Sequence, residues 1–221
     1  MKARGFRMVA TVIIAALAAL AVHASGGTAQ PEPTTPELTP EQLADQFYNE
    51  GLVYRDKAWK FEEELAAAAE ADRAKLEKRI EKNYTRAIAS FEDALRNNPN
   101  LYQAASSLGY ALRKTGEYDD ALAAYDHALS IQPNYAEAIE YRAEAYLGLN
   151  RIDEAKESYL TLFGSDRPRA DELLAAMQRW LAAPPQSVDG ATVESFRAWV
   201  DERAEIAGNT APVSQLGEKS W

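Results

Sequence analysis

The sequence contains no cysteine, and this absence excludes several kinds of stabilising and catalytic chemistry. Disulfides, thiol nucleophiles and thiolate metal sites are excluded, so packing alone must stabilise the fold. Histidine is scarce as well. The two histidines, His23 and His127, are too far apart in the sequence to form a pair at metal-ligand spacing. We therefore expect no metal site and no cofactor.

Catalytic motifs are missing too. The sequence has no serine-centred nucleophile elbow, no glycine-rich phosphate loop and no dinucleotide fingerprint. His127 stands between Asp126 and Ala128, and we interpret it as an exposed or rim residue. We predict that the protein is not an enzyme and has no catalytic residues.

Basic residues are fewer than acidic ones. The sequence has 24 Lys and Arg residues and 34 Asp and Glu residues, which gives a formal net charge of -10. An acidic surface repels phosphate, so we expect no nucleic-acid partner. The simplest reason for the charge is solubility.

Long apolar runs are absent apart from residues 8–22, which follow the basic residues Lys2, Arg4 and Arg7. This order, with small residues around Ala24, predicts a signal peptide over residues 1–24. The run is shorter than the roughly 20 residues of a membrane span. Cleavage removes three positive charges and no acid, which takes the net charge from -10 to -13.

The leader predicts an exported protein, and its short Ala-rich form without cysteine fits a bacterial periplasm. We expect no membrane insertion after cleavage. The alternative is an inner-membrane protein anchored by an uncleaved leader.

Residues 25–40 are predicted to form an unpacked linker, because four prolines interrupt them: Pro31, Pro33, Pro36 and Pro40. At its end, Thr39, Pro40 and Gln42 have the pattern of a helix-capping box. The folded domain is expected to begin there.

A recurrence of 34 residues organises the rest of the chain. It relates Ala87, Ala121 and Ala155, and likewise Phe91, Tyr125 and Tyr159, and Pro99 and Pro133. A fixed period of this length predicts an array of helical units, each of which buries its apolar face by stacking on its neighbours.

Each unit is predicted to be two antiparallel helices. In the second unit these cover about residues 102–114 and 119–131, with Gly116 in a left-handed turn, where the third unit has Asn150. The expected N-caps of the second helices are Thr85, Asp119 and Asp153, each preceded by a hydrophobic staple: Tyr84, Tyr118 and Ile152.

These positions resemble the tetratricopeptide repeat family, whose pattern is W-x2-L-G-x2-Y, then A-x3-F, then P. The second unit matches best, through Leu108, Gly109, Leu112, Gly116, Ala121, Tyr125, Ala128 and Pro133. The resemblance covers residues 41–168 and implies an all-α solenoid of three helical hairpins. Small residues such as Gly51, Gly109 and Ala121 would let neighbouring helices approach closely.

The first unit departs from the pattern, because its two halves are 24 residues further apart than those of the second. The insertion, about residues 56–83, has no Pro or Gly and predicts an elongated hairpin that turns near residues 70–73. Trp59, Phe61 and Leu65 are expected to face the returning helix. They either pack within the hairpin or form a docking surface.

After the third unit, residues 169–207 are predicted to form C-terminal capping helices. The expected packing residues are Leu173, Met177 and Trp180 in the first and Val193, Phe196 and Val200 in the last. Residues 208–221 show no periodicity and are expected to be a disordered tail.

The resemblance implies a concave groove lined by the first helix of each unit, and such arrays mostly bind other proteins. Spacing places these residues there: Tyr48, Leu52 and Arg55; Gln103, Ser106, Tyr110 and Arg113; Glu137, Glu140 and Glu144. Some family members hold a peptide's terminal carboxylate with Lys, Arg and Asn at such positions. Here Tyr48, Leu52, Glu137 and Tyr141 stand there, so we do not expect a carboxylate clamp.

We therefore predict a scaffold or adaptor of the bacterial cell envelope that binds a protein or peptide partner. The expected partner segment carries apolar side chains, anchored near Tyr48 and Tyr110, and some positive charge attracted by the glutamates. The glutamates could equally be a solvated helix face. The alternative function is a structural, homo-oligomeric component that assembles through the first hairpin.

Overall fold

The computed structural model describes residues 37–216 of the chain. The expected leader and most of the proline-rich linker precede this range, and residues 217–221 follow it. Those predictions therefore lie outside the described residues.

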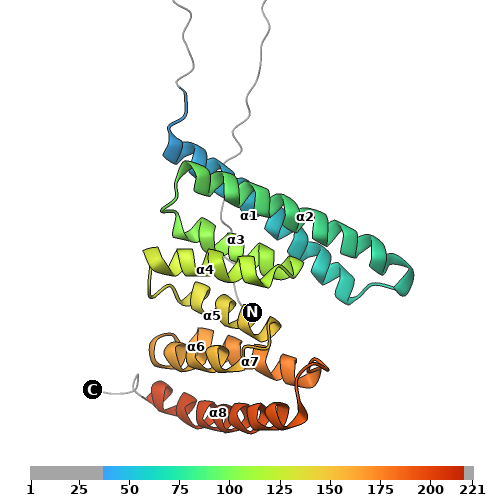
Figure 1. Cartoon of the computed structure of the whole chain (residues 1–221), viewed down its shortest axis with the longest axis vertical. Helices are drawn as coiled ribbons and strands as arrows, with labels where there is room; N and C mark the ends of the chain where they lie inside the picture. The colour runs from blue at the N-terminus through green and yellow to red at the C-terminus, as the bar shows by residue number, and fades with distance from the viewer. Residues whose placement is uncertain (1–36, 217–221) are drawn as a thin grey trace, which may run out of the picture. The chain divides into compact units, whose positions relative to one another are not determined.

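Within the described range the chain folds into eight helices and no strand (Figure 1). Successive helices pack against one another as antiparallel pairs, which agrees with the predicted helical-hairpin solenoid. The helices are α1 (Pro40–Ala66), α2 (Glu70–Asn97), α3 (Tyr102–Thr115), α4 (Tyr118–Ile131), α5 (Ala136–Gly148), α6 (Ile152–Ser165), α7 (Arg167–Ala182) and α8 (Gly190–Leu216). None of them is both long and apolar enough to cross a membrane, within the residues that the structure describes.

The predicted capping box begins α1. The backbone N–H of Gln42 donates to Thr39 Oγ1 at 3.3 Å, and the backbone N–H of Thr39 donates to Gln42 Oε1 at 2.9 Å. Pro40 occupies the first helical position, where no backbone donor is needed. This prediction is confirmed.

The elongated first hairpin is confirmed as well, because α1 and α2 have 27 and 28 residues whereas α3 to α7 have 13–16. Figure 1 shows the pair running past the ends of α3 and α4. The turn lies at residues 67–69, ahead of the predicted 70–73. Glu70 and Asp72 instead lie in the first turn of α2, where acidic side chains interact favourably with the helix dipole.

The predicted N-caps of the second helices are wrong. Helices α4 and α6 begin at Tyr118 and Ile152, directly after Glu117 and Arg151, which make no side-chain capping bond. Asp119 and Asp153 therefore lie in the first turn, where their charge favours the helix N-terminus without capping it. Thr85 lies inside the continuous α2, where its hydroxyl donates to the carbonyl of Glu81 at 3.0 Å.

The predicted left-handed turns are confirmed, since Gly116 has a φ of 88° and Asn150 a φ of 60°. After each, a backbone N–H reaches back to a carbonyl five residues earlier. Glu117 donates to Leu112 at 2.9 Å, and Arg151 donates to Tyr146 at 2.8 Å. Repeats two and three thus end their first helices by the same hydrogen bond.

Close helix approach depends on small residues, as the pattern predicts. A Cβ atom added to Gly51 would lie 2.4 Å from the Phe91 ring, and one added to Gly109 would lie 2.7 Å from the Tyr125 ring. Ala87 belongs to the same buried cluster as Phe91 and is fully buried. The spacing of 34 residues therefore repeats one packing contact, an aromatic ring lying on a helix backbone.

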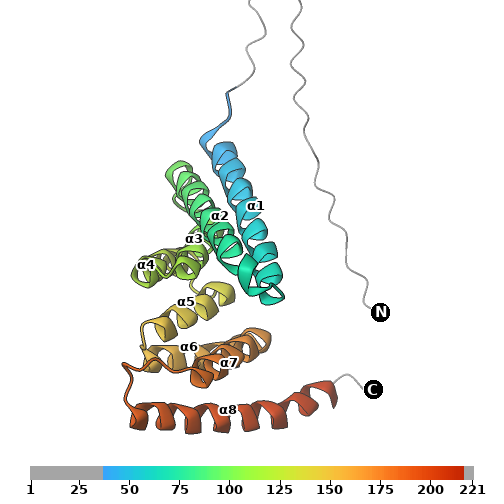
Figure 2. The same cartoon turned by 90° about the vertical axis from the view of Figure 1, so that its right-hand side faces the viewer.

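Helices α7 and α8 close the C-terminal end. Helix α7 packs on α5 and α6, and Figure 2 shows α8 crossing beneath α6 and α7. The expected packing residues are buried, except that Trp180 is half-buried and its indole N–H donates to the carbonyl of Leu147 at 3.0 Å. Helix α8 continues to Leu216, past residue 207, where we expected it to end.

Candidate partner-binding face

Helices α1, α3, α5 and α7 contact one another in order and form one surface of the array. We call this surface the inner face. It contains eight of the ten predicted groove residues, all except Ser106 and Glu140, together with Trp59, Tyr102, Tyr135, Tyr141, Arg169 and Arg179.

A row of three aromatic side chains and one arginine crosses the inner face from α1 to α7. The ring of Trp59 lies edge-on to Tyr110 with centroids 5.8 Å apart, and its indole N–H donates to the Tyr110 hydroxyl at 2.7 Å. Tyr110 then meets Tyr141 at 5.0 Å, and the guanidinium of Arg169 lies 5.7 Å from the Tyr141 ring. Each of the four helices contributes one member of the row.

Trp59 packs on a buried cluster that contains Tyr84 and Phe91 of the returning helix α2, and its indole N–H reaches further, to α3. Phe61 also faces α2, where the guanidinium of Arg79 lies 4.0 Å from its ring centroid. The guanidinium of Arg55 covers Trp59 at 4.2 Å and is paired with Asp56 at 2.9 Å. Trp59 therefore joins the hairpin to the second repeat.

A second aromatic group lies toward the start of the same helices. Tyr102 and Tyr135 meet edge-on at 5.0 Å, and the Tyr135 hydroxyl donates to Glu137 at 3.1 Å. Tyr48 is half-buried and lies 5.9 Å from Phe91. Burial raises the pKa of Tyr48 above its ordinary value, although a side-chain hydrogen bond with Ser107 offsets part of this effect.

The acidic end of the predicted groove differs from expectation. Arg169 lies 2.5 Å from Glu140 and 3.6 Å from Glu137, while Arg113 lies 2.5 Å from Glu144. Arg179 also approaches Glu144, at 3.7 Å. The glutamates are thus neither a solvated face nor a free negative patch, because arginines of the same chain pair with them.

Two predicted groove residues are not on the surface at all. Ser106 is 1% exposed and Glu140 is 3% exposed. Burial raises the pKa of Glu140 to about 7, although the hydrogen bond from Arg169 offsets part of this effect. The remaining predicted residues are half-buried: Tyr48, Leu52, Arg55, Gln103, Tyr110, Arg113, Glu137 and Glu144.

Sequence reasoning missed Arg169 for a definite reason. The spacing of 34 residues aligns Arg169 with Tyr135, which lies just before α5 and therefore outside a helix. Helix α7 starts earlier in the repeat, at Arg167, with Asp166 accepting the backbone N–H of Arg169 at 3.2 Å. Asp166 followed closely by Pro168 is the signal that would have located this start.

The structure offers little for catalysis among the residues it describes. No three His, Asp or Glu side chains in that part of the chain lie close enough to hold a metal ion. His127 is exposed and its Nε2 lies 2.7 Å from the carbonyl oxygen of Pro99, so the ring joins α4 to the loop between α2 and α3.

Comparison with known proteins gives matches to two family models, both described as tetratricopeptide repeat, over residues 72–136 and 112–179. No curated protein sequence matches the chain.

Among solved structures, the chain is similar to the first tetratricopeptide domain of Spaghetti (RPAP3) bound to the HSP90 peptide SRMEEVD. The identity is 18% and the TM-score is 0.41, with 60% of this chain and 94% of that chain covered. A double mutant of MamA (RS-1 ArsTM) has 19% identity and a TM-score of 0.38, covering 74% of this chain and 96% of that one.

The matched segments include the helix pairs α3–α4 and α5–α6, which have the 34-residue spacing, the left-handed turns and the buried small residues described above. Residues 72–179 therefore match tetratricopeptide repeat models, and the described chain folds as a solenoid of helical hairpins.

Proposed function

We propose that the protein is a non-enzymatic scaffold that binds a partner protein or peptide on its inner face. Tetratricopeptide repeats generally mediate protein–protein interactions, and the family is typically non-catalytic. The observation that carries the proposal is the set of half-buried apolar and aromatic side chains on α1 and α3, namely Tyr48, Leu52 and Tyr110. Contacts with neighbouring rings hold Tyr48 and Tyr110 in place, so little conformational entropy is lost when a partner packs on them.

The site lies in the α1–α3 half of the inner face. In the α5–α7 half, Arg113, Arg169 and Arg179 already pair with the glutamates, and displacing these pairs would cost free energy. We expect a partner segment that contributes mainly apolar side chains. Its affinity should depend weakly on salt, since the carboxylates that would attract basic residues are paired.

Substitution of Leu52 tests this site, and Val53 supplies a matched control. Leu52 is half-buried on the inner face, whereas Val53 is 51% exposed on α1. Proteins captured from the source cell by the parent chain should also be captured by Val53→Glu and lost with Leu52→Glu. Gln103→Glu is a milder second variant, and thermal unfolding checks that each variant is folded. Equal capture by Leu52→Glu would contradict the assigned site.

We propose further that the protein acts in the bacterial cell envelope after export to the periplasm. The support is the basic and then apolar order of residues 1–24. Fractionation of source cells together with sequencing of the mature N-terminus tests this. A mature chain that starts near Ser25 in the periplasmic fraction is expected, and an intact leader in the membrane fraction would favour the anchored alternative.

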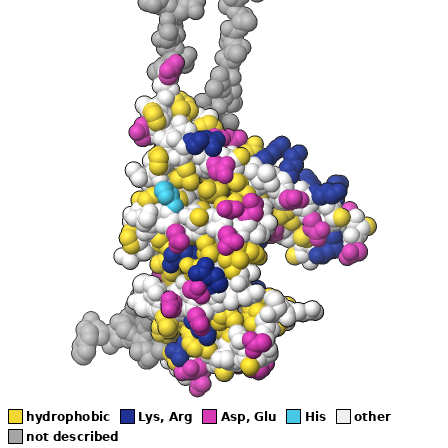
Figure 3. Space-filling view, in the orientation of Figure 1, with side chains coloured by type: hydrophobic (Ala, Val, Ile, Leu, Met, Phe, Trp, Pro, Cys, Tyr) yellow, Lys and Arg dark blue, Asp and Glu magenta, His cyan; other side chains and the backbone are white. Residues whose placement is uncertain are grey.

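Self-assembly is the second candidate function, and one feature of the hairpin favours it. Exposed basic side chains follow one side of α2 at helical spacing, at Lys75, Lys78, Lys82 and Arg86, and Figure 3 shows basic residues gathered there. In an acidic chain such a row could bind a second copy. Light scattering at low and high salt tests this, and a monomer at micromolar concentration in both would exclude it.

A further inference from the structure

A groove separate from the inner face lies between α2 and α4, with α3 as its floor. It has a volume of about 600 Å³. Figure 3 shows hydrophobic side chains in this region with acidic ones beside them. The apolar lining comes from Ile88, Leu95, Ala105, Leu108, Leu112 and Ala124.

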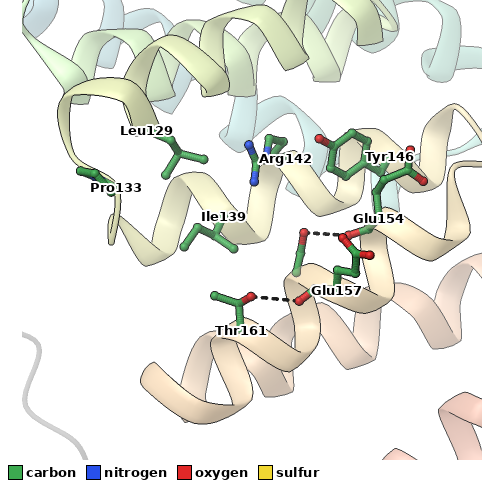
Figure 4. A pocket seen from close by; sticks show the side chains of 9 residues that line it. Leu129, Pro133, Ile139, Arg142, Tyr146, Glu154, Glu157 and Thr161 are labelled. Atoms are coloured by element: carbon green, nitrogen blue, oxygen red, sulfur yellow. Dashed lines mark hydrogen bonds between the residues drawn. The ribbon is translucent and has the colours of Figure 1, made fainter.

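The next repeat has the equivalent groove, between α4 and α6, which is smaller, with a volume of about 400 Å³, and has an arginine in its lining. All of its lining residues are related by 34 positions to residues that line the first groove, and Arg142 stands where the first has Leu108. Arg142 pairs with Asp126 at 2.6 Å and lies 5.7 Å from the Tyr146 ring. Figure 4 shows Arg142 between Ile139 and Tyr146, along the line of this groove.

The first groove is therefore the larger and more apolar version of a groove to which the third repeat contributes an arginine. Glu92 is the counterpart of Asp126 in the first groove, because it precedes Asp126 by 34 residues. With Leu108 in place of arginine, Glu92 has no guanidinium from the floor to pair with. The apolar floor and the carboxylate both remain open to a ligand.

The rim of the first groove carries charge of one sign from both walls. Glu92 lies on α2, Asp120 on α4, and Glu117 directly before α4, and all three are exposed. A ligand that matches this arrangement has an apolar face for the floor and positive charges along both edges. An amphipathic helix with Lys or Arg beside its apolar stripe has that form.

We propose that the groove between α2 and α4 binds an amphipathic basic helix of a partner protein. The apolar side chains of that helix pack on Leu108 and Leu112, and its Lys or Arg residues pair with Glu92 and Asp120. This site is distinct from the inner face, so one scaffold can hold two partners at once.

The test uses a fluorescein-labelled 14-residue peptide of Leu and Lys in which Leu recurs at spacings of three and four, with the full chain and fluorescence anisotropy as readout. We expect the parent chain to bind this peptide with micromolar affinity. The affinity should fall about tenfold or more with Leu108→Arg, because the new arginine can pair with Glu92 as Arg142 pairs with Asp126. The matched control Leu160→Arg changes an exposed leucine on α6 and should bind as the parent does. The variant Glu92→Gln/Asp120→Asn keeps the floor intact and should weaken binding about fivefold at low salt.

Three results would overturn the proposal. Equal affinity for a scrambled peptide of the same composition would mean that charge alone attracts it to an acidic chain. Unchanged affinity with both Leu108→Arg and Glu92→Gln/Asp120→Asn would place the peptide elsewhere. A dimer that Leu108→Arg converts to a monomer, seen by light scattering, would make a second copy of this chain the occupant of the groove.

Discussion

The indole N–H of Trp59 donates a hydrogen bond of 2.7 Å to the hydroxyl of Tyr110 and joins the elongated hairpin to the second repeat. Trp59 belongs to the stretch that lengthens the first unit, so this stretch does not simply project from the array. Tyr110 continues the contact to Tyr141 of the third unit. The order of the inner face therefore depends in part on the insertion.

The first prediction concerns this hydrogen bond. Trp59→Phe and Tyr110→Phe each remove one of its partners and should each destabilise the chain by about 1 kcal/mol. Because the two changes remove the same bond, the double variant should cost less than the sum of the single ones. Urea denaturation of the four proteins measures this, and strict additivity would show that the bond contributes nothing to stability.

The second prediction concerns helix packing. Gly109→Ala places a methyl group 2.7 Å from the Tyr125 ring and should cost about 1–3 kcal/mol. Gly164→Ala is the control, because a Cβ there meets nothing within 4 Å. That change should be neutral or stabilising, by up to about 1 kcal/mol, since alanine favours helix more than glycine. Denaturation midpoints that fall equally in both variants would refute the packing argument.

The third prediction concerns pH. Burial raises the pKa of Glu140 from 4.5 to about 7, so the folded chain binds this proton more tightly than the unfolded chain does. The resulting stabilisation is present below pH 4.5 and is lost as the pH rises through 7. Between pH 5 and pH 8 the parent should therefore lose up to about 3 kcal/mol relative to Glu140→Gln.

Urea denaturation at the two pH values measures this difference. Glu172→Gln is the control, because Glu172 also contacts Arg169, at 3.1 Å, but is exposed. A Glu140→Gln variant whose stability follows the same pH dependence as the parent would show that the carboxylate is ionised throughout this range.

The fourth prediction concerns the left-handed turn after α3. Gly116→Ala forces a Cβ into a backbone with a φ of 88° and should cost about 1 kcal/mol. Gly116→Asn should cost less, because Asn150 adopts a φ of 60° at the same point of the next repeat. Thermal unfolding of both variants measures the order, and alanine performing as well as asparagine would contradict it.

The architecture was predictable from the sequence because the repeat spaces its buried residues regularly. Gly109 and Tyr125 mark a contact that Gly51 and Phe91 repeat in the first hairpin, and local turn residues confirm the register. The caps were not predictable in the same way. An aspartate near a helix start can cap the helix or lie in its first turn, and Asp119 does the second.

The candidate site was predictable only in part. Periodicity identifies the face of each helix, which is local information, and so it could group Tyr48 with Tyr110. It gave no information about which side chains of other helices lie opposite them. The pairing of Glu140 with Arg169 spans 29 residues and depends on where α7 starts.

The central claim is that a partner protein contacts the inner face beside Tyr48. The most direct measurement replaces Tyr48 with the photo-crosslinking residue p-benzoylphenylalanine in the source cell and compares it with the same replacement at the exposed Val53. The account predicts a cross-linked partner from position 48 and none from position 53. Adducts of equal yield from both positions, or from position 53 alone, would contradict it.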